Sequence, residues 1–227
     1  MRRKSYIEQF KRLENRFGIQ LRKFGRWKHF VESGQRRNLV AHCNSVVTEQ
    51  YLSQCKAEGI NIPDDVQVGD ITKIGPAYLF AATFLVFEVG VKLAQTLWRK
   101  ALPDELATAD RHLNNTIFDL LWDEEWIAAE RLGEYARQLP NMQRDADRRI
   151  AAINHAIALR QLNKNEDALS VLADFDWGET VSAEFRLAER ILAEDYESAE
   201  RLFRMVGGDG EFFDEHAYHS WPLFIDF

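Results

Sequence analysis

The sequence predicts an all-α protein, and three observations support this class. Only 5 prolines and 12 glycines interrupt its 227 residues. Ala, Leu, Glu and Arg, which form helices readily, are abundant. Apolar residues recur every three or four positions in several segments, which is the spacing of one helix face. Because 46% of the residues are hydrophobic, the chain can form a packed core, which excludes a disordered protein.

Helices are expected over 5–16, 21–33 and 35–47, and the segment from 48 to near 59 should either continue the third helix or form a short fourth one. Gly18 and Gly34 are the expected breaks, because glycine commonly follows the last residue of a helix. The third helix is expected to bury four apolar side chains: Leu39, Val40, Val46 and Val47.

An irregular segment over 60–75, with a short strand or turn at Val66–Ile71, should lead into a long helix over 78–100. Its apolar run, Ile74–Phe87, is too short to cross a bilayer, so we expect a buried core helix and no membrane contact. Asp104 is expected to cap the next helix, which runs through residue 121. This helical bundle is assigned to residues 1–120.

The C-terminal part, residues 121–227, has a different sequence pattern from the N-terminal part. Ala129, Ala168 and Ala199 each follow an acidic or polar lead, at separations of 39 and 31 residues. A small residue lets two antiparallel helices approach closely, so the pattern predicts stacked helical hairpins. The segment resembles degenerate tetratricopeptide repeats, although their tryptophan, glycine and proline signature is mostly absent. Ordinary helical hairpins remain the alternative. A protein partner could bind this half, and the aromatic tail over 212–227 could dock on its own chain or on a neighbour.

Charge is distributed unevenly along the chain. The net charge is −7, but residues 1–37 hold 12 basic and only 3 acidic side chains. A basic segment of this kind suits a polyanionic partner, although it could also be a solvated face.

The cysteines and the N-terminus bear on the compartment. Cys43 and Cys55 have neither zinc-ligand spacing nor a disulfide framework around them, which favours a reducing compartment. The N-terminus has no apolar segment typical of a signal peptide. We therefore expect a cytoplasmic protein.

The most informative motif is RRNLVAH at residues 36–42. Arginine holds a phosphate with a planar fork of donors, and histidine transfers protons near neutral pH. Asn38 and His42, four residues apart, share one helix face. Arg37 lies roughly 140° from His42 around the helix axis, so its side chain must reach round or act from a partner chain. Together these residues suggest cleavage of RNA without a metal ion.

The motif resembles that of the HEPN superfamily of helical domains. The likeness rests on R-N-x3-H at residues 37–42, on the flanking VVTEQYL and on GDITKIGPAYL leading into a long helix, and it covers about residues 1–120. It implies a metal-independent endoribonuclease without a cofactor, acting as a homodimer whose motifs face each other across a two-fold axis. Asn44 stands where some HEPN toxins carry a tyrosine that their antitoxin modifies, so that form of control is not expected here.

The resemblance also implies roles for individual residues. His42 would act as general base or acid, Arg37 would stabilise charge on the phosphate, and Asn38 would orient the histidine or the phosphate. Four further side chains would hold the RNA backbone: Arg36, Lys28, Arg26 and Lys23. The expected substrate is RNA, tRNA included, and the expected setting is that of a toxin or phage-defence effector. The alternatives are a non-catalytic HEPN subunit that binds RNA or protein, and a purely structural adaptor.

Each motif residue also has a purely structural interpretation. His42 could be hydrogen-bonded within the core, and Asn38 could cap a helix. Arg37 could pair with Asp64 or Glu88.

Overall fold

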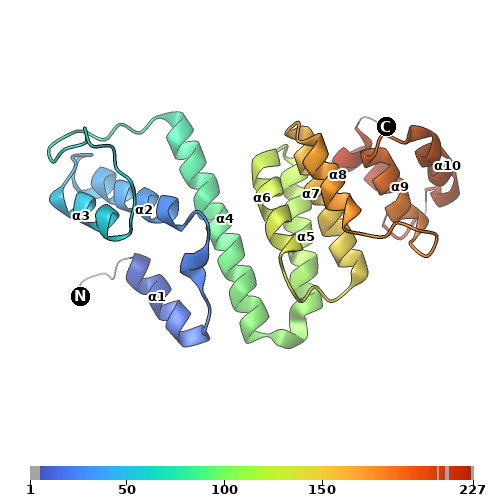
Figure 1. The fold of residues 1–227 in the computed structure, drawn as a ribbon, viewed down its shortest axis with the longest axis horizontal. Helices are drawn as coiled ribbons and strands as arrows, with labels where there is room; N and C mark the ends of the chain where they lie inside the picture. The colour runs from blue at the N-terminus through green and yellow to red at the C-terminus, as the bar shows by residue number, and fades with distance from the viewer. Residues whose placement is uncertain (1–5, 209, 213–214, 226–227) are drawn as a thin grey trace. The chain divides into compact units, whose positions relative to one another are not determined.

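The computed structural model describes residues 6–208, 210–212 and 215–225 (Figure 1). This part of the chain is all-α, with eleven α-helices and no strand, so the predicted class is confirmed. Its contacts divide the chain into two compact units, Met1–Lys100 and Ala101–Phe227.

The first unit contains four α-helices and one short 3-10 helix: α1 (Tyr6–Phe17), η1 (Leu21–Lys23), α2 (Trp27–His42), α3 (Glu49–Ala57) and α4 (Pro76–Ala101). One hydrophobic cluster joins α1, α2 and α4 through Phe10, Trp27, Val31, Leu85 and Val89. A second cluster joins the end of α2 to α3 through Leu39, Val47, Tyr51 and Cys55. The motif helix α2 is therefore held from both sides.

The expected break at Gly34 is wrong, since α2 continues through it as one helix of 16 residues. A Cβ atom at position 34 would lie 3.1 Å from Cδ2 of Tyr6. This glycine therefore lets the Tyr6 ring of α1 approach α2 closely, and it does not end the helix.

The motif helix ends at His42, five residues earlier than expected. Asn44 and Ser45 adopt positive φ angles of 49° and 65°, which turn the chain away from the helix axis. Val47 is buried beyond this turn, whereas Val40 is 44% exposed, so the expected buried face is only partly correct.

Of the short strand or turn expected at Val66–Ile71, the structure shows a turn, in which the Asp70 N–H donates to the Gln67 carbonyl, and one antiparallel bridge at its end. Val46 pairs with Ile71, and the Val47 N–H donates to the carbonyl of Asp70 at 2.8 Å. Thr48 then caps α3, because its Oγ1 accepts from the Tyr51 N–H at 3.2 Å. The loop thus fixes the start of α3 opposite the end of α2.

Helix α4 is not the buried core helix that its composition predicts. Leu85, Glu88, Val89 and Gln95 are its buried residues, whereas Leu79 is 61% and Val86 54% exposed. Among the described helices, α4 alone is long and apolar enough to cross a membrane by those two criteria, with a mean hydropathy of 1.7. Part of its apolar surface is therefore exposed outside the two hydrophobic clusters of the first unit.

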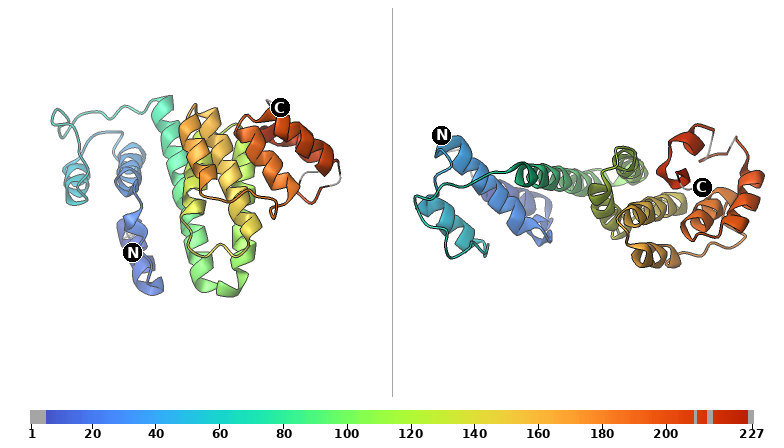
Figure 2. Two further views of the ribbon diagram at one scale, coloured as in Figure 1. Left: turned by 45° about the vertical axis from the view of Figure 1, so that its right-hand side comes forward. Right: turned by 90° about the horizontal axis from the view of Figure 1, so that it is seen from above.

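The second unit consists of antiparallel helical pairs that stack side by side (Figures 1 and 2). Its helices are η2 (Pro103–Glu105), α5 (Leu106–Trp122), α6 (Trp126–Arg137), α7 (Asp145–Gln161), α8 (Asn165–Ala173), α9 (Ala183–Leu192), α10 (Tyr196–Val206), α11 (Glu215–Ser220) and η3 (Pro222–Phe224). Because α5 packs on α6 and α7, the division between the units lies at residue 100, not at 120. Asp104 lies in η2, and α5 begins without a side-chain cap.

The three alanines identified in the sequence occupy equivalent places in the three hairpins. Ala129, Ala168 and Ala199 are all buried. Five residues before each of them the chain turns through a left-handed residue, at Glu124, Asn163 and Glu194, with φ of 59°, 59° and 61°. The same turn therefore joins the two helices of every hairpin: α5 to α6, α7 to α8 and α9 to α10.

The aromatic tail docks on the unit to which it belongs. Trp221, Pro222 and Leu223 are buried, and the Trp221 ring lies 6.2 Å from that of Phe118 on α5. Of the two expectations for the tail, docking on its own chain is the one the structure shows.

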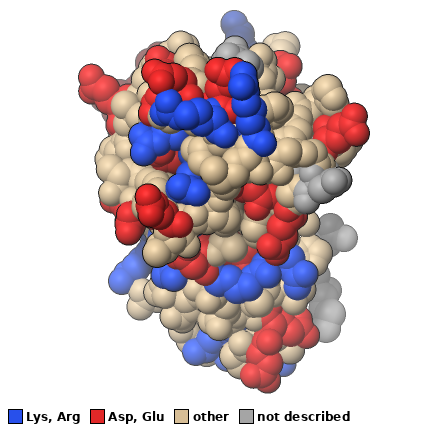
Figure 3. Space-filling model, turned by 90° about the vertical axis from the view of Figure 1, so that its right-hand side faces the viewer, with Lys and Arg blue, Asp and Glu red and all other residues tan. Residues whose placement is uncertain are grey.

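Acidic and basic side chains are interspersed on the face drawn in Figure 3. Ion pairs such as Arg201–Glu197 and Arg204–Glu200 on α10 combine the two signs within one helix. On this face the acidic surplus of the C-terminal half therefore does not form a patch of one sign.

Acid should destabilise the second unit through His155, which is 4% exposed on α7. Burial, with the nearby charges of Arg137 and Lys164, lowers its pKa to about 4. The unfolded chain, with the ordinary histidine pKa of 6.5, takes up a proton as the pH falls below 6.5, whereas the folded chain does not. We expect a loss of at most about 3 kcal/mol between pH 6.5 and 4.

Urea unfolding at pH 7 and pH 5 of wild type and of His155→Gln measures this effect. The variant should lose less stability between the two pH values than wild type. An equal loss in both proteins would show that other groups cause the acid sensitivity.

Candidate functional site

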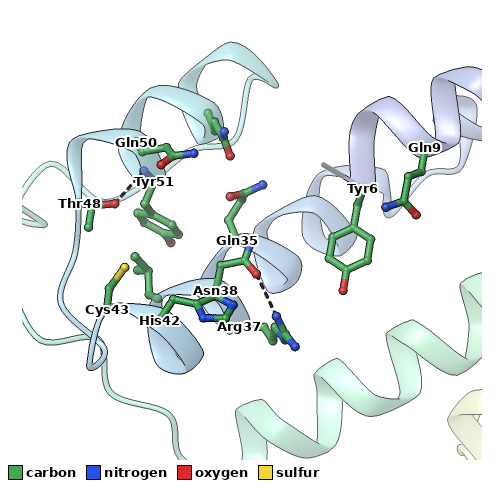
Figure 4. Close-up of a pocket in the computed structure, with 12 residues that line it drawn as sticks. Tyr6, Gln9, Gln35, Arg37, Asn38, His42, Cys43, Thr48, Gln50 and Tyr51 are labelled. Atoms are coloured by element: carbon green, nitrogen blue, oxygen red, sulfur yellow. Dashed lines mark hydrogen bonds between the residues drawn. The ribbon is translucent and has the colours of Figure 1, made fainter. Parts of the chain in front are cut away.

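Three polar residues of the motif helix lie on one face of α2. Gln35, Asn38 and His42 are separated by three and four residues, so their side chains point to the same side. They line a pocket of about 680 Å³ between α2, α3 and the start of α1 (Figure 4). Twelve side chains form its walls: Tyr6, Gln9, Gln35, Arg37, Asn38, Leu39, His42, Cys43, Thr48, Gln50, Tyr51 and Gln54.

Arg37 reaches round the helix to join this face. Its Nη1 atom donates to Oδ1 of Asn38 at 3.2 Å (Figure 4). The structure therefore brings Arg37, Asn38 and His42 to one pocket within a single chain. The imidazole of His42 is exposed, and the guanidinium lies beside an amide that fixes its position.

Arg37 also borders a second, apolar groove on the other side of α2. This groove measures about 850 Å³ and lies between α2 and the first half of α4. Its apolar walls include Phe30, Val40, Ile74, Leu79 and Val86. One arginine thus stands between a polar pocket and an apolar surface.

The structural interpretations of the three motif residues do not match their positions. His42 is exposed at the last residue of α2 and is not part of the core. Asn38 lies inside the helix and caps nothing. Glu88 pairs with Arg26 and Lys92, and Arg37 forms no ion pair with a described carboxylate.

The four residues expected to hold the RNA backbone do not line the pocket. Arg26 pairs with Glu88 at 2.8 Å, and Arg36 pairs with Glu32 at 2.6 Å. Lys23 and Lys28 are exposed to solvent. A basic sequence segment therefore divides into structural ion pairs and free surface charges, a division that composition does not reveal.

Glu32 organises a partly buried polar cluster behind the pocket. Its Oε1 accepts from Tyr51 at 2.8 Å and from Nε of Arg36 at 2.6 Å, and its Oε2 accepts from Tyr78 at 3.2 Å. The Arg36 guanidinium lies 4.5 Å from the centre of the Tyr78 ring. Three helices, α2, α3 and α4, meet at this single carboxylate.

Burial and the charge of Glu32 together make the two tyrosines harder to deprotonate. Burial and the neighbouring carboxylate raise the pKa of Tyr78 to about 12 and that of Tyr51 further. Both hydroxyls therefore remain hydrogen-bond donors at neutral pH, and neither is a proton acceptor there. Their role is to hold α3 and α4 against the motif helix.

Sequence reasoning missed the amide side chains of the pocket. Gln35, Gln50 and Gln54 line it together with Asn38 and Gln9. The spacing of residues 35, 38 and 42 was a usable signal, but the expected break at Gly34 placed Gln35 at a helix start. Gln50 and Gln54 are four residues apart on α3, so they share a face.

When compared with known proteins, the chain matches no protein-family model, no curated protein and no solved structure. The pocket and its chemistry are therefore the features that indicate a function.

Proposed function

We propose that the chain is a metal-independent endoribonuclease of the HEPN type. The observation that supports this most is the convergence of Arg37, Asn38 and His42 on one polar pocket, with Arg37 bonded to the amide of Asn38. A phosphate-binding fork and a solvent-exposed imidazole are the two groups that RNA transesterification requires.

In this proposal His42 takes the proton from the ribose 2′-hydroxyl. The 2′-oxygen then attacks the phosphorus, and the bond to the 5′-oxygen breaks. Arg37 binds the non-bridging oxygens, where negative charge increases. The products are a 2′,3′-cyclic phosphate and a 5′-hydroxyl, the latter after the leaving oxygen takes up a proton. DNA lacks the 2′-hydroxyl and should not be cleaved.

Acid–base catalysis of this step uses two groups, one for the attacking oxygen and one for the leaving oxygen. His42 is the one histidine among the residues that line the pocket. A second copy of the chain, related by a two-fold axis, would supply the other imidazole. The apolar groove that shares Arg37 with the pocket is the surface we propose for this contact.

Val86→Glu should prevent this association. Val86 is 54% exposed and lines the apolar groove, so a carboxylate there would have to be desolvated on dimerisation. Light scattering after gel filtration should show a dimer for wild type and a monomer for the variant, with RNA cleavage reduced at least about tenfold.

Val68→Glu is a matched control, because Val68 is 56% exposed and lies outside the groove. It should remain dimeric and active. A monomeric wild type that cleaves RNA at full rate would exclude the two-fold arrangement.

The proposed activity is tested by incubating the protein with total RNA and with tRNA in EDTA, followed by mapping of the cleaved ends. Fragments with cyclic phosphate and 5′-hydroxyl ends, and intact DNA of the same sequence, are expected. Intact RNA with a folded dimer at high concentration would contradict the proposal. A toxin or defence effector of this kind should also arrest growth when its expression is induced.

A non-catalytic subunit is the second candidate, and one feature of the second unit favours it. A groove of about 360 Å³ there is lined by Asn114 and Asn154, whose buried Oδ1 atoms have no hydrogen-bond partner among the described residues. A partner segment could donate to these oxygens. Co-purification of a protein through this groove, unchanged by His42→Ala and Arg37→Ala and lost on Asn154→Leu, would favour this function.

A further inference from the structure

We propose that the pocket beside the motif holds one unpaired nucleobase of the RNA and selects adenine. This inference deepens the proposed function and rests on it for the nature of the ligand. It starts from the amide side chains, which neither phosphate binding nor proton transfer uses.

Gln35 is the first observation. Its side chain is only 7% exposed, yet it forms no hydrogen bond with the described residues. Its carboxamide points into the space between α3 and the start of α1 (Figure 4). A carboxamide that has no protein partner and points into a pocket is available to pair with a ligand held there.

The second observation is that more amides face the same space. Gln50 and Gln54 line the pocket from α3, across from Gln35 on α2. Neither of their side chains is hydrogen-bonded to described residues. Each amide offers a donor and an acceptor side by side, which is the pattern on the edge of a base.

The character of the pocket favours adenine over cytosine and guanine. A glutamine amide pairs with adenine through two bonds, accepting from the N6 amino group and donating to a ring nitrogen. Cytosine is usually read by a carboxylate, and none lines this pocket. Guanine is usually read by arginine, and we assign the single arginine of the pocket, Arg37, to the phosphate.

The size and the walls of the pocket suit an extruded base. Its volume of about 680 Å³ is within the range of small-molecule sites. Tyr6, 41% exposed, offers an aromatic ring at the rim, and single-stranded bases commonly stack on such rings. Substrates with an unpaired adenosine next to the scissile phosphate therefore fit best.

The test uses the full chain and RNA hairpins whose loop carries A, G, C or U beside the cleavage site. Wild type should cleave the adenosine substrate at least about tenfold faster than each of the others. Gln35→Leu should reduce this preference to less than about threefold. Gln138→Leu, directly after α6 in the other unit, is the matched control and should keep the full preference.

Folding is checked separately, because Gln35 is nearly buried. Leucine has a similar volume and removes an unpaired amide, so the melting temperature of Gln35→Leu should not fall. Gln54→Leu, at a less buried position on α3, gives a second test of the same preference.

Binding distinguishes failure of this inference from failure of the proposed activity. Hairpins with a 2′-deoxy sugar at the scissile position cannot be cleaved, and their affinity is measured by fluorescence anisotropy. Selective binding of adenosine that Gln35→Leu abolishes would support the inference even if no RNA is cleaved. The inference would be overturned by equal affinity for all four bases, by selection of another base, or by a preference that Gln35→Leu leaves intact. None of these results would contradict the proposed cleavage of RNA.

Discussion

His42→Ala should reduce RNA cleavage by about 10²–10⁴-fold, the usual contribution of a positioned proton-transfer group. The imidazole is exposed at the end of α2, so its removal should leave the melting temperature unchanged. Initial rates of cleavage of a labelled RNA in EDTA measure the effect. Growth arrest on induced expression should be lost in parallel.

His29→Ala is the matched control for this prediction. His29 is an exposed histidine on the same helix, but it does not line the pocket. It should keep the wild-type rate. If both variants cleave equally well, His42 is not the proton-transfer group and the assignment of the pocket to RNA cleavage is wrong.

Glu32→Ala should lower the free energy of unfolding by about 2–4 kcal/mol, because it removes one acceptor from three donors at once. Tyr51, Tyr78 and the Arg36 guanidinium would be left without their shared partner. Since these groups join α2, α3 and α4, we also expect cleavage to fall in the fraction that remains folded. Urea unfolding measured by circular dichroism gives the free energy.

Glu49→Ala provides the comparison, because Glu49 is exposed in the first turn of α3 and lies outside this cluster. Its effect should stay within about 0.5 kcal/mol. A stability of Glu32→Ala close to wild type would show that water replaces the carboxylate and that the cluster does not hold the helices together.

The hairpins of the second unit were predictable because the residues that define them lie close together in the sequence. A buried alanine must follow each turn at a fixed distance for two helices to approach, and Ala129, Ala168 and Ala199 show this distance in the sequence. The boundary between the units was not predictable in the same way. Helix α5 has a buried face that fits either unit, and only its contacts assign it.

Two predictions, the helix break at Gly34 and the burial of α4, were wrong because they depend on packing between helices. A glycine at position 34 is consistent both with the end of a helix and with close packing against Tyr6. Only the packing of α1 distinguishes the two. The apolar composition of α4 predicts burial, yet residues such as Leu79 and Val86 are exposed. Composition shows that a helix is apolar, but it does not show which residues, if any, pack against its apolar side chains.

The shared helix face of the motif residues could be predicted from the sequence, but their contacts with other helices could not. The spacing of Asn38 and His42 placed both on one face in advance. The Arg36–Glu32 pair is local, four residues apart on one helix, but that Tyr51 and Tyr78 join it depends on contacts across 19 and 46 residues of sequence. Long-range partners of this kind cannot be read from a single chain.

The recurring left-handed turn has a consequence for how this protein can change in length. The turns at Glu124, Asn163 and Glu194 keep their geometry while α7 has 17 residues and α9 only 10. Seven residues are about two helical turns, so the longer helix presents its buried face in the same direction as the shorter one. Insertions and deletions of whole turns therefore preserve the stack, and hairpins of unequal size can be combined in one array without a change in the joint between their helices.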